Sequence, residues 1–215
     1  MFKKIVGFFF VLLYSQIVWS ADAIDQLRNF SKNTKTSMGD FVQQQVSQTS
    51  DGKLKVNKEL SGRFLFSRPG RFVWTTIKPY EQKMVADGKQ LAMWDKDLNQ
   101  VTYRAANQAL ATTPAAILFG DTPLEQYFEL KLVGEKGDLT WVELSPKSNQ
   151  AGGGDIPYSK IGIGMNNNLP QAMELRDNFG NVVLLTFSNI KTNIAVAPSE
   201  FVFKPPPGTD VVKLP

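Results

Sequence analysis

The chain has 215 residues, with 24 lysines and arginines, 20 aspartates and glutamates, no cysteine and no histidine. The lack of cysteine excludes disulfides, thiol chemistry and a lipid on an N-terminal cysteine, while the lack of histidine removes the commonest general base and metal ligand. The charge is only mildly basic, and no basic cluster or nucleic-acid-binding motif accompanies it, so we expect no nucleic-acid partner.

Residues 1–21 have the pattern of a signal peptide. Two lysines precede the apolar stretch Ile5–Val18, which is short for a membrane span. Small residues follow, and we expect cleavage between residues 20 and 23. An uncleaved membrane anchor is the alternative. Residues 22–215 would then form a single exported domain, because a chain of this length can bury one sizeable core.

The first part of this domain is expected to contain one helix and a series of strands. Asp22–Lys32 has apolar residues at three-residue spacing, which predicts a short amphipathic helix. Alternation and turn signals such as Asp87-Gly88 then predict a meander of strands. These strands are Phe41–Gln48, Val56–Ser67, Arg71–Ile77, Lys83–Ala86, Gln90–Trp94 and Gln100–Arg104.

The pattern then changes to short helices before strands resume. Ala105–Leu118 is rich in alanine, Thr113-Pro114 predicts the start of a helix at Ala115–Phe119, and Thr122–Glu125 has the form of a capping box. Five further strands are predicted, at Tyr127–Val133, Leu139–Ser145, Lys160–Met165, Ala172–Arg176 and Val182–Lys191. Pro198–Phe203 is expected to form one helical turn and a last short strand. A proline-rich tail is expected to be extended, and the Gly-rich segment 147–158 is a loop to which we assign no role.

These elements indicate a mainly β (α+β) fold. About ten or eleven antiparallel strands would form a strongly curved, incomplete β-barrel, with short helices as a lid. Such a curved sheet is not filled by its own side chains, so an apolar pocket is expected in its concavity.

One strand combines aromatic residues with a charge. Phe64, Phe66 and Arg68 share a face because side chains alternate along a strand, and Phe72 and Trp74 follow on the next strand. An arginine cannot be neutralised, so Arg68 must reach acceptors at the edge of this apolar face. Two plainer interpretations stay open: that the aromatic residues are ordinary core, and that Arg68 is a surface residue.

The sequence offers no constellation for catalysis. Asp95 and Asp97 lie in a turn, and Asp155 beside three glycines lacks a phosphate-loop context. No Gly-x-Ser-x-Gly nucleophile motif occurs. We therefore expect neither an enzyme nor a metal or cofactor site.

Three motifs in their order resemble the periplasmic outer-membrane lipoprotein carrier family, LolA. They are Phe66–Trp74 (FSRPGRFVW), Asp87–Trp94 (DGKQLAMW) and the ending Phe201–Val212 (FVFKPPPGTDVV). The Thr113-Pro114 helix fits the same family, and the resemblance covers nearly the whole chain after the signal peptide. It implies a soluble periplasmic chaperone that carries lipidated proteins from an inner-membrane ABC transporter to an outer-membrane receptor.

The resemblance also assigns residues. It places the family's latch arginine at Arg68 and the lid helix at Pro114–Phe119, so we expect Arg68 to bond to carbonyls near Leu118 and Phe119. The full set of expected cavity residues is Phe64, Phe66, Phe72, Trp74, Met84, Trp94 and Ile117. We expect a monomer. The alternative function is a secreted hydrolase or isomerase with a hydrophobic substrate in the same cavity.

Overall fold

A computed structural model of the protein describes residues 22–48, 51, 54–105, 118, 124–147 and 157–214. The predicted signal peptide, most of the predicted alanine-rich helix and nearly all of the Gly-rich segment lie outside these residues. Within them, no helix is long and apolar enough to cross a membrane.

Strands dominate the structure. Their bounds are β1 (Thr36–Gln48), β2 (Leu54–Ser67), β3 (Arg71–Lys78), β4 (Gln82–Asp87), β5 (Gln90–Asp95), β6 (Gln100–Ala105), β7 (Phe128–Lys136), β8 (Leu139–Pro146), β9 (Tyr158–Asn166), β10 (Leu169–Asp177), β11 (Val182–Thr192) and β12 (Asp210–Lys213). The helical elements are α1 (Ala23–Asn33), α4 (Leu124–Tyr127) and the 3₁₀ turn η1 (Pro198–Phe201).

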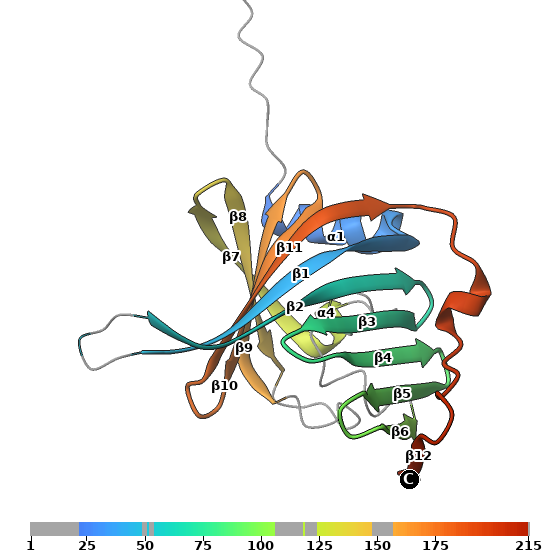
Figure 1. The fold of residues 1–215 in the computed structure, drawn as a ribbon. Helices are drawn as coiled ribbons and strands as arrows, with labels where there is room; N and C mark the ends of the chain where they lie inside the picture. Colours follow the sequence, from blue (N-terminus) through green and yellow to red (C-terminus); the bar gives the residue numbers. More distant parts are fainter. Residues whose placement is uncertain are drawn as a thin grey trace, which may run out of the picture.

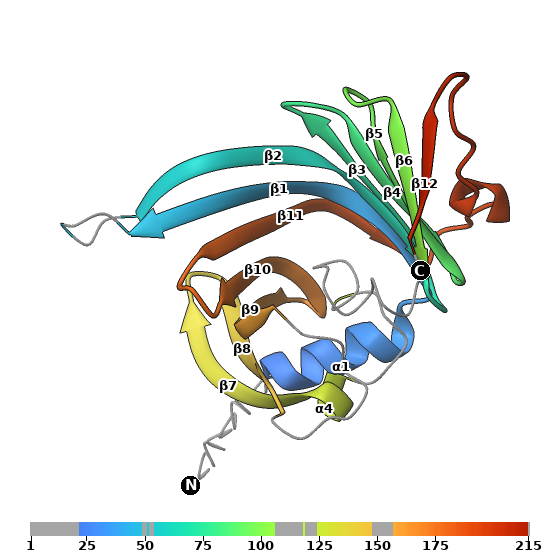
Figure 2. The same cartoon turned by 90° about the horizontal axis from the view of Figure 1, so that it is seen from below.

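The twelve strands form one strongly curved, open sheet in the order β12-β6-β5-β4-β3-β2-β1-β11-β10-β9-β8-β7 (Figures 1 and 2). Hairpins and meanders build most of this order, as the turn signals predict. The central contact is long-range, because β1 pairs with β11 through neighbours such as Phe41 and Phe187. The predicted fold class, an incomplete and mainly antiparallel curved barrel, is confirmed.

Three details of the prediction are wrong. The sheet has one strand more than the upper expected count, because Asp210–Lys213 forms β12 where an extended tail was expected. β12 also runs parallel to β6, so the sheet is not wholly antiparallel. The expected short strand at the end of Pro198–Phe203 is absent there; after η1 this stretch has no regular structure.

Helix α1 lies inside the curve of the sheet (Figure 2). It begins after Asp22, whose side chain accepts a hydrogen bond of 2.9 Å from the Asp25 amide and so caps the helix. Its apolar side, with Leu27 and Phe30, is buried in the main core. The predicted helix therefore exists, but it fills part of the concavity.

A buried glutamine fixes α1 to the far half of the sheet. The Gln26 side chain donates to Thr140 Oγ1 at 2.9 Å and accepts from the Asn168 amide at 3.0 Å. A buried amide group is costly unless both ends are paired. These two bonds therefore hold α1 against β8 and the β9–β10 turn.

The sheet has a second, smaller core on its outer face. Val73 and Val85 pack there against Phe201 of η1, and Leu65 and Phe203 lie beside them. The sheet is thus covered on both faces at β3–β5, as the apolar sequence Leu91–Trp94 indicates.

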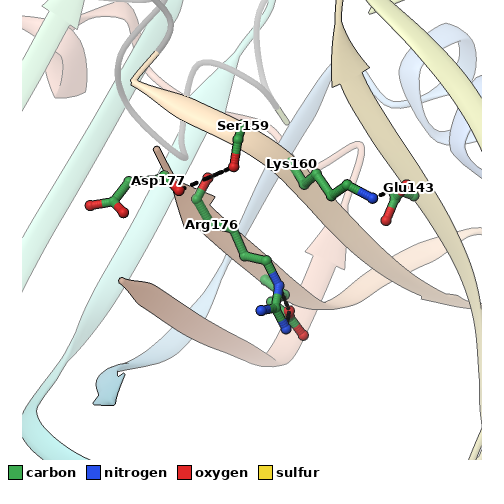
Figure 3. A network of polar contacts seen from close by, with 6 residues as sticks. Glu143, Ser159, Lys160, Arg176 and Asp177 are labelled. Atoms are coloured by element: carbon green, nitrogen blue, oxygen red, sulfur yellow. Dashed lines mark hydrogen bonds and ion pairs between the residues drawn. The ribbon is translucent and has the colours of Figure 1, made fainter. Parts of the chain in front are cut away.

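The outer face of β8–β10 is polar. Lys160 pairs with Glu143 at 3.0 Å, and Arg176 pairs with Glu174 at 2.6 Å (Figure 3). Ser159 Oγ donates to the carbonyls of Arg176 and Asp177 and ties the ends of β9 and β10 together. Exposed pairs of this kind contribute little to stability, so this face is a solvated surface.

Candidate functional site

The candidate site is the inner face of β2–β5, where the aromatic residues gather. Phe64 lies directly opposite Trp74, and Phe66 opposite Phe72, in the β2–β3 pairing. Directly opposed residues share a face, so alternation brings these four side chains together as expected. All four are buried, with exposed fractions of 0–5%.

The aromatic face is tightly packed in this structure. Phe41 of β1 stacks on Trp74 with ring centroids 4.0 Å apart, and Phe187 of β11 meets Phe64 edge-on at 5.7 Å. From the helix side, Phe30 meets Phe66 edge-on at 6.2 Å. The interior is therefore filled at this end by α1 and the surrounding aromatic side chains.

An apolar-floored pocket remains at the other end of the same face. It has a volume of about 250 Å³, and its inner-face lining includes Trp74, Met84, Met93 and Thr76. Met84 lies opposite Trp74 on one side and opposite Met93 on the other. The Gln82 amide donates to Asp95 at the rim, which lowers the pKa of the Asp95 carboxyl and keeps it charged at neutral pH.

Trp94 does not belong to the inner face. It follows Met93 in β5 and lies opposite Lys83, so its side chain points to the outer side although the residue borders the pocket. Its ring lies 6.2 Å from Phe203, in the outer layer. Its assignment to the inner cavity wall is wrong, because the unbroken apolar run Leu91–Trp94 does not indicate which of its residues face inward.

Arg68 lies at the end of β2, at the edge of the aromatic face, and is half-buried. Its Nε donates to the Thr34 carbonyl at 3.0 Å, and its Nη2 donates to the Leu118 carbonyl at 2.9 Å. The guanidinium also lies over the Phe66 ring at 5.2 Å. One side chain therefore joins the end of α1, the aromatic face and a helical residue from the predicted lid.

The other predicted latch and lid residues are only partly described. Leu118 is buried in the main core, so it contributes both a carbonyl to Arg68 and an apolar side chain to the interior. Ile117 and Phe119 lie outside the described residues.

A charged pair joins the two described helices on this side. Arg28 of α1 donates from Nε to Glu125 Oε1 of α4 at 2.9 Å. This bond lowers the pKa of the Glu125 carboxyl and raises the pKa of Arg28. Lys147 adds a bond of 2.6 Å to the Glu125 carbonyl. The pair connects α1 directly to α4, whereas Arg68 connects the end of α1 to Leu118.

Sequence reasoning missed the inward role of α1 and the carbonyl of Thr34. The spacing of Leu27 and Phe30 shows that the helix has an apolar face but not which surface it covers. Thr34 acts through its backbone, for which a side-chain pattern gives no signal. Among the described residues, no group of three or more acidic side chains is placed to hold a metal ion.

Comparison with known proteins identifies relatives along nearly the whole chain. The family model "Outer membrane lipoprotein carrier protein LolA" matches residues 32–204. An outer-membrane lipoprotein carrier protein of Ralstonia nicotianae is 47% identical over 206 residues, covering 94% of each chain. That of Chromobacterium violaceum is 42% identical over 192 residues, covering 89% of this chain and 88% of its own.

A solved structure supports the fold alone. An uncharacterised conserved protein from Thermus thermophilus superposes with a TM-score of 0.56 at 12% sequence identity, covering 89% of this chain and 96% of that one. The family match and the identities of 42–47% go further. The chain belongs to the LolA family of outer-membrane lipoprotein carrier proteins.

Proposed function

We propose that this protein is a periplasmic carrier for lipoproteins. It accepts their acyl chains when an inner-membrane ABC transporter releases them, and it passes them to an outer-membrane receptor. It acts as a monomer and catalyses no reaction. The relatives' names and the family match support the carrier role. The alternative, a secreted hydrolase or isomerase, does not explain why the relatives are named as lipoprotein carriers.

The observation that carries the mechanism is the position of Arg68. Arg68 donates hydrogen bonds to backbone carbonyls of two separate segments, Thr34 at the end of α1 and Leu118 of the predicted lid. A charged donor bonded to a neutral acceptor contributes about 1.5–3 kcal/mol. These bonds support a closed state that Arg68 stabilises, in which α1 and Leu118 cover the proposed acyl-binding surface.

Closure sets the affinity for cargo. Each acyl CH₂ removed from water is worth about 0.8 kcal/mol, so a chain of about sixteen carbons gains at most about 12 kcal/mol. A carrier that retained all of this gain could not release its cargo. Binding also requires the Arg68 bonds to break and the α1 contacts to open, and this cost offsets part of the free energy gained from burying the acyl chain. The cargo therefore passes readily to a better acceptor.

The pocket at Trp74 and Met84 gives the acyl chain a place to enter. It lies on the same face as the covered aromatic residues and is already open. A chain that begins there can extend along β2–β3 as α1 moves away.

A reconstituted transfer assay tests the proposal. Inner-membrane vesicles that hold the transporter and a labelled lipoprotein receive ATP and the purified protein, and the soluble fraction is then mixed with receptor-bearing vesicles. We expect a soluble one-to-one complex that delivers its lipoprotein. Met84→Glu should prevent complex formation, because a carboxylate among acyl chains is costly.

The matched control is Thr75→Glu, which places the same charge on the outer face of β3 opposite Lys83. This variant should carry cargo normally. The proposal fails if the wild-type protein leaves the lipoprotein in the vesicles, or if folded Met84→Glu carries it as well as Thr75→Glu does.

A further inference from the structure

The outer face of the sheet holds the largest hollow described for this molecule. It has a volume of about 770 Å³ and lies between β4–β6 and the C-terminal segment. That segment is fixed at two places: Phe201 is buried against Val73 and Val85, and β12 pairs with β6. Between these anchors it spans the ends of the strands (Figure 1). Sites for small ligands commonly have volumes of about 300–1,000 Å³.

The floor of the hollow is apolar. Val85 and Ala92 face it from the sheet, and Phe201, Val202 and Phe203 face it from the C-terminal segment. Two apolar residues of the lining remain accessible to solvent, Val202 at 59% and Leu214 at 40%. Contiguous apolar surface exposed in a concave place is typical of a ligand site.

The rim of the hollow is basic. Lys89 and Lys213 line it, and neither has an ion-pair partner in the part of the chain that the structure describes. Arg104 borders it too, but Arg104 lies opposite Leu91 and so belongs to the inner face. Asp87 is the one acidic residue of the described lining. Its Oδ1 accepts hydrogen bonds from the amides of Lys89 and Gln90 at 2.7 and 2.8 Å, so it is engaged in the turn. An anion at the rim would therefore meet unpaired positive charge.

We propose that this hollow binds a single-chain anionic amphiphile. The alkyl chain lies on the apolar floor beneath Val202, and the carboxylate or phosphate head lies between Lys89 and Lys213. Because inner and outer residues alternate along β3–β5, this site and the cargo face use opposite sides of the same strands. The site is therefore separate from the lipoprotein cavity and does not depend on the carrier function.

Calorimetric titration of the purified protein tests the site without any lipoprotein. The probes are dodecanoate and lauroyl-lysophosphatidylglycerol, which separate a fatty acid from a lysophospholipid, with dodecyl maltoside as the uncharged probe of equal chain length. All titrations use the Met84→Glu background, so that the inner pocket is closed to the alkyl chain. We expect one site that binds at least one anionic probe about tenfold more tightly than the maltoside.

Two sets of variants locate that site. Val202→Glu should weaken binding of all probes at least about tenfold, while the matched control Val56→Glu, at an exposed valine of β2, should change nothing. Lys89→Gln with Lys213→Gln should weaken only the anionic probes. The proposal is overturned if neither anionic probe binds, or if Val202→Glu and Val56→Glu bind the probes equally. Both valines are exposed, so folded variants are expected, and circular dichroism checks this.

Discussion

In the proposed mechanism, opening and closing of the cavity depend on Arg68. Its guanidinium is planar and offers several donors at once, which lets it reach the Thr34 and Leu118 carbonyls together while it covers the Phe66 ring. The backbone amide of Arg68 also donates to the Lys35 carbonyl at 2.8 Å, so the base of the side chain is held in place. The latch is therefore anchored at both ends.

Replacing Arg68 should trap cargo on the carrier. Arg68→Leu removes both hydrogen bonds to carbonyls but keeps an apolar side chain, so the open state loses its energetic penalty. We expect normal uptake and release slowed at least about tenfold, the effect of losing one bond of about 1.5 kcal/mol. Arg68→Lys should be intermediate, since an ammonium cannot fork to two carbonyls in fixed directions.

The measurement is retention of a labelled lipoprotein after receptor is added. Arg71→Leu is the control, because among the described residues the Arg71 side chain bonds to Ser67 and lies over Phe201, on the outer face. If Arg68→Leu delivers cargo at the wild-type rate, Arg68 is an ordinary edge residue.

The Arg28–Glu125 pair should make helix docking depend on pH. The folded-state pKa of Glu125 lies below its ordinary value of 4.5, chiefly because Arg28 donates a hydrogen bond to it. Its contribution is therefore complete above pH 4.5 and disappears as the pH falls through the lowered pKa. At neutral pH the pair is intact.

Glu125→Gln tests this dependence. We expect a lower melting temperature than wild type at neutral pH and no difference once the pH is below the lowered pKa, as followed by circular dichroism. Glu129→Gln, at an exposed residue of β7, should match wild type throughout. A difference between Glu125→Gln and wild type that persists unchanged at low pH would contradict the assigned role.

For single residues, the sequence predicts positions correctly where they depend on alternation within one strand. Alternation brings Phe64 and Phe66 to one face and leaves Arg68 at its edge. It failed for Trp94, because an apolar run gives no parity by itself and β5 is covered on both sides. The Thr34 acceptor could not be found, because backbone carbonyls carry no signal in the side-chain pattern.

At the scale of elements, α1 packs on the inner face of the sheet, where the proposed cargo site lies. Its apolar residues Leu27 and Phe30 are almost fully buried, and Gln26 fixes it to β8 and to the β9–β10 turn. The helix is therefore part of the closed core rather than a peripheral cap. Opening must either displace it or separate the sheet from it.

Shortening Phe30 should weaken the closed state directly. Phe30→Ala removes its contact with Phe66 and leaves a cavity, which costs about 3–5 kcal/mol of unfolding free energy in well-packed cores. The loss should be smaller if the sheet closes over the gap. Urea unfolding followed by fluorescence measures it, and the variant should also hold cargo longer than wild type.

Phe179→Ala is the matched control for that experiment. Phe179 is 91% exposed in the β10–β11 turn, so its loss should change stability by less than about 0.5 kcal/mol. Equal effects of the two substitutions would show that α1 does not support the core.

Strands that pair with the next strand in the sequence are well predicted, whereas pairings between strands that are distant in the sequence are not. The hairpins of β2–β6 and β8–β11 are local, so turn residues such as Gly88 mark them. β12 is different: its partner is β6, which lies far earlier in the chain, and four residues without a hairpin turn do not reveal a parallel pairing. The strand was therefore interpreted as a tail.

At the scale of the whole molecule, one sheet offers two different faces. The inner face is aromatic and closed by α1 and Arg68, and the outer face near β4–β6 carries the second hollow. The mainly β curved architecture could be predicted from strand count and turn spacing. Which strands meet at its centre could not, because the β1–β11 pairing depends on packing of the complete chain.

The location of the protein is tested on the whole molecule. Two lysines, an apolar stretch and small residues before Ile24 predict removal of a signal peptide. N-terminal sequencing of the protein from a fractionated cell should find a mature start between Ala21 and Ile24 in the periplasmic fraction. An intact N-terminal methionine in the membrane fraction would show that the segment is an anchor.

The pairing of β1 with β11 has a consequence for how the molecule comes into being. A chain that emerges with its N-terminus first can assemble β1–β6 early, but the free side of β1 stays unpaired until residues near Phe187 arrive. An unpaired strand edge invites association with other chains, and contacts between distant residues form slowly. During its own synthesis and export, this carrier is therefore itself a molecule in need of protection.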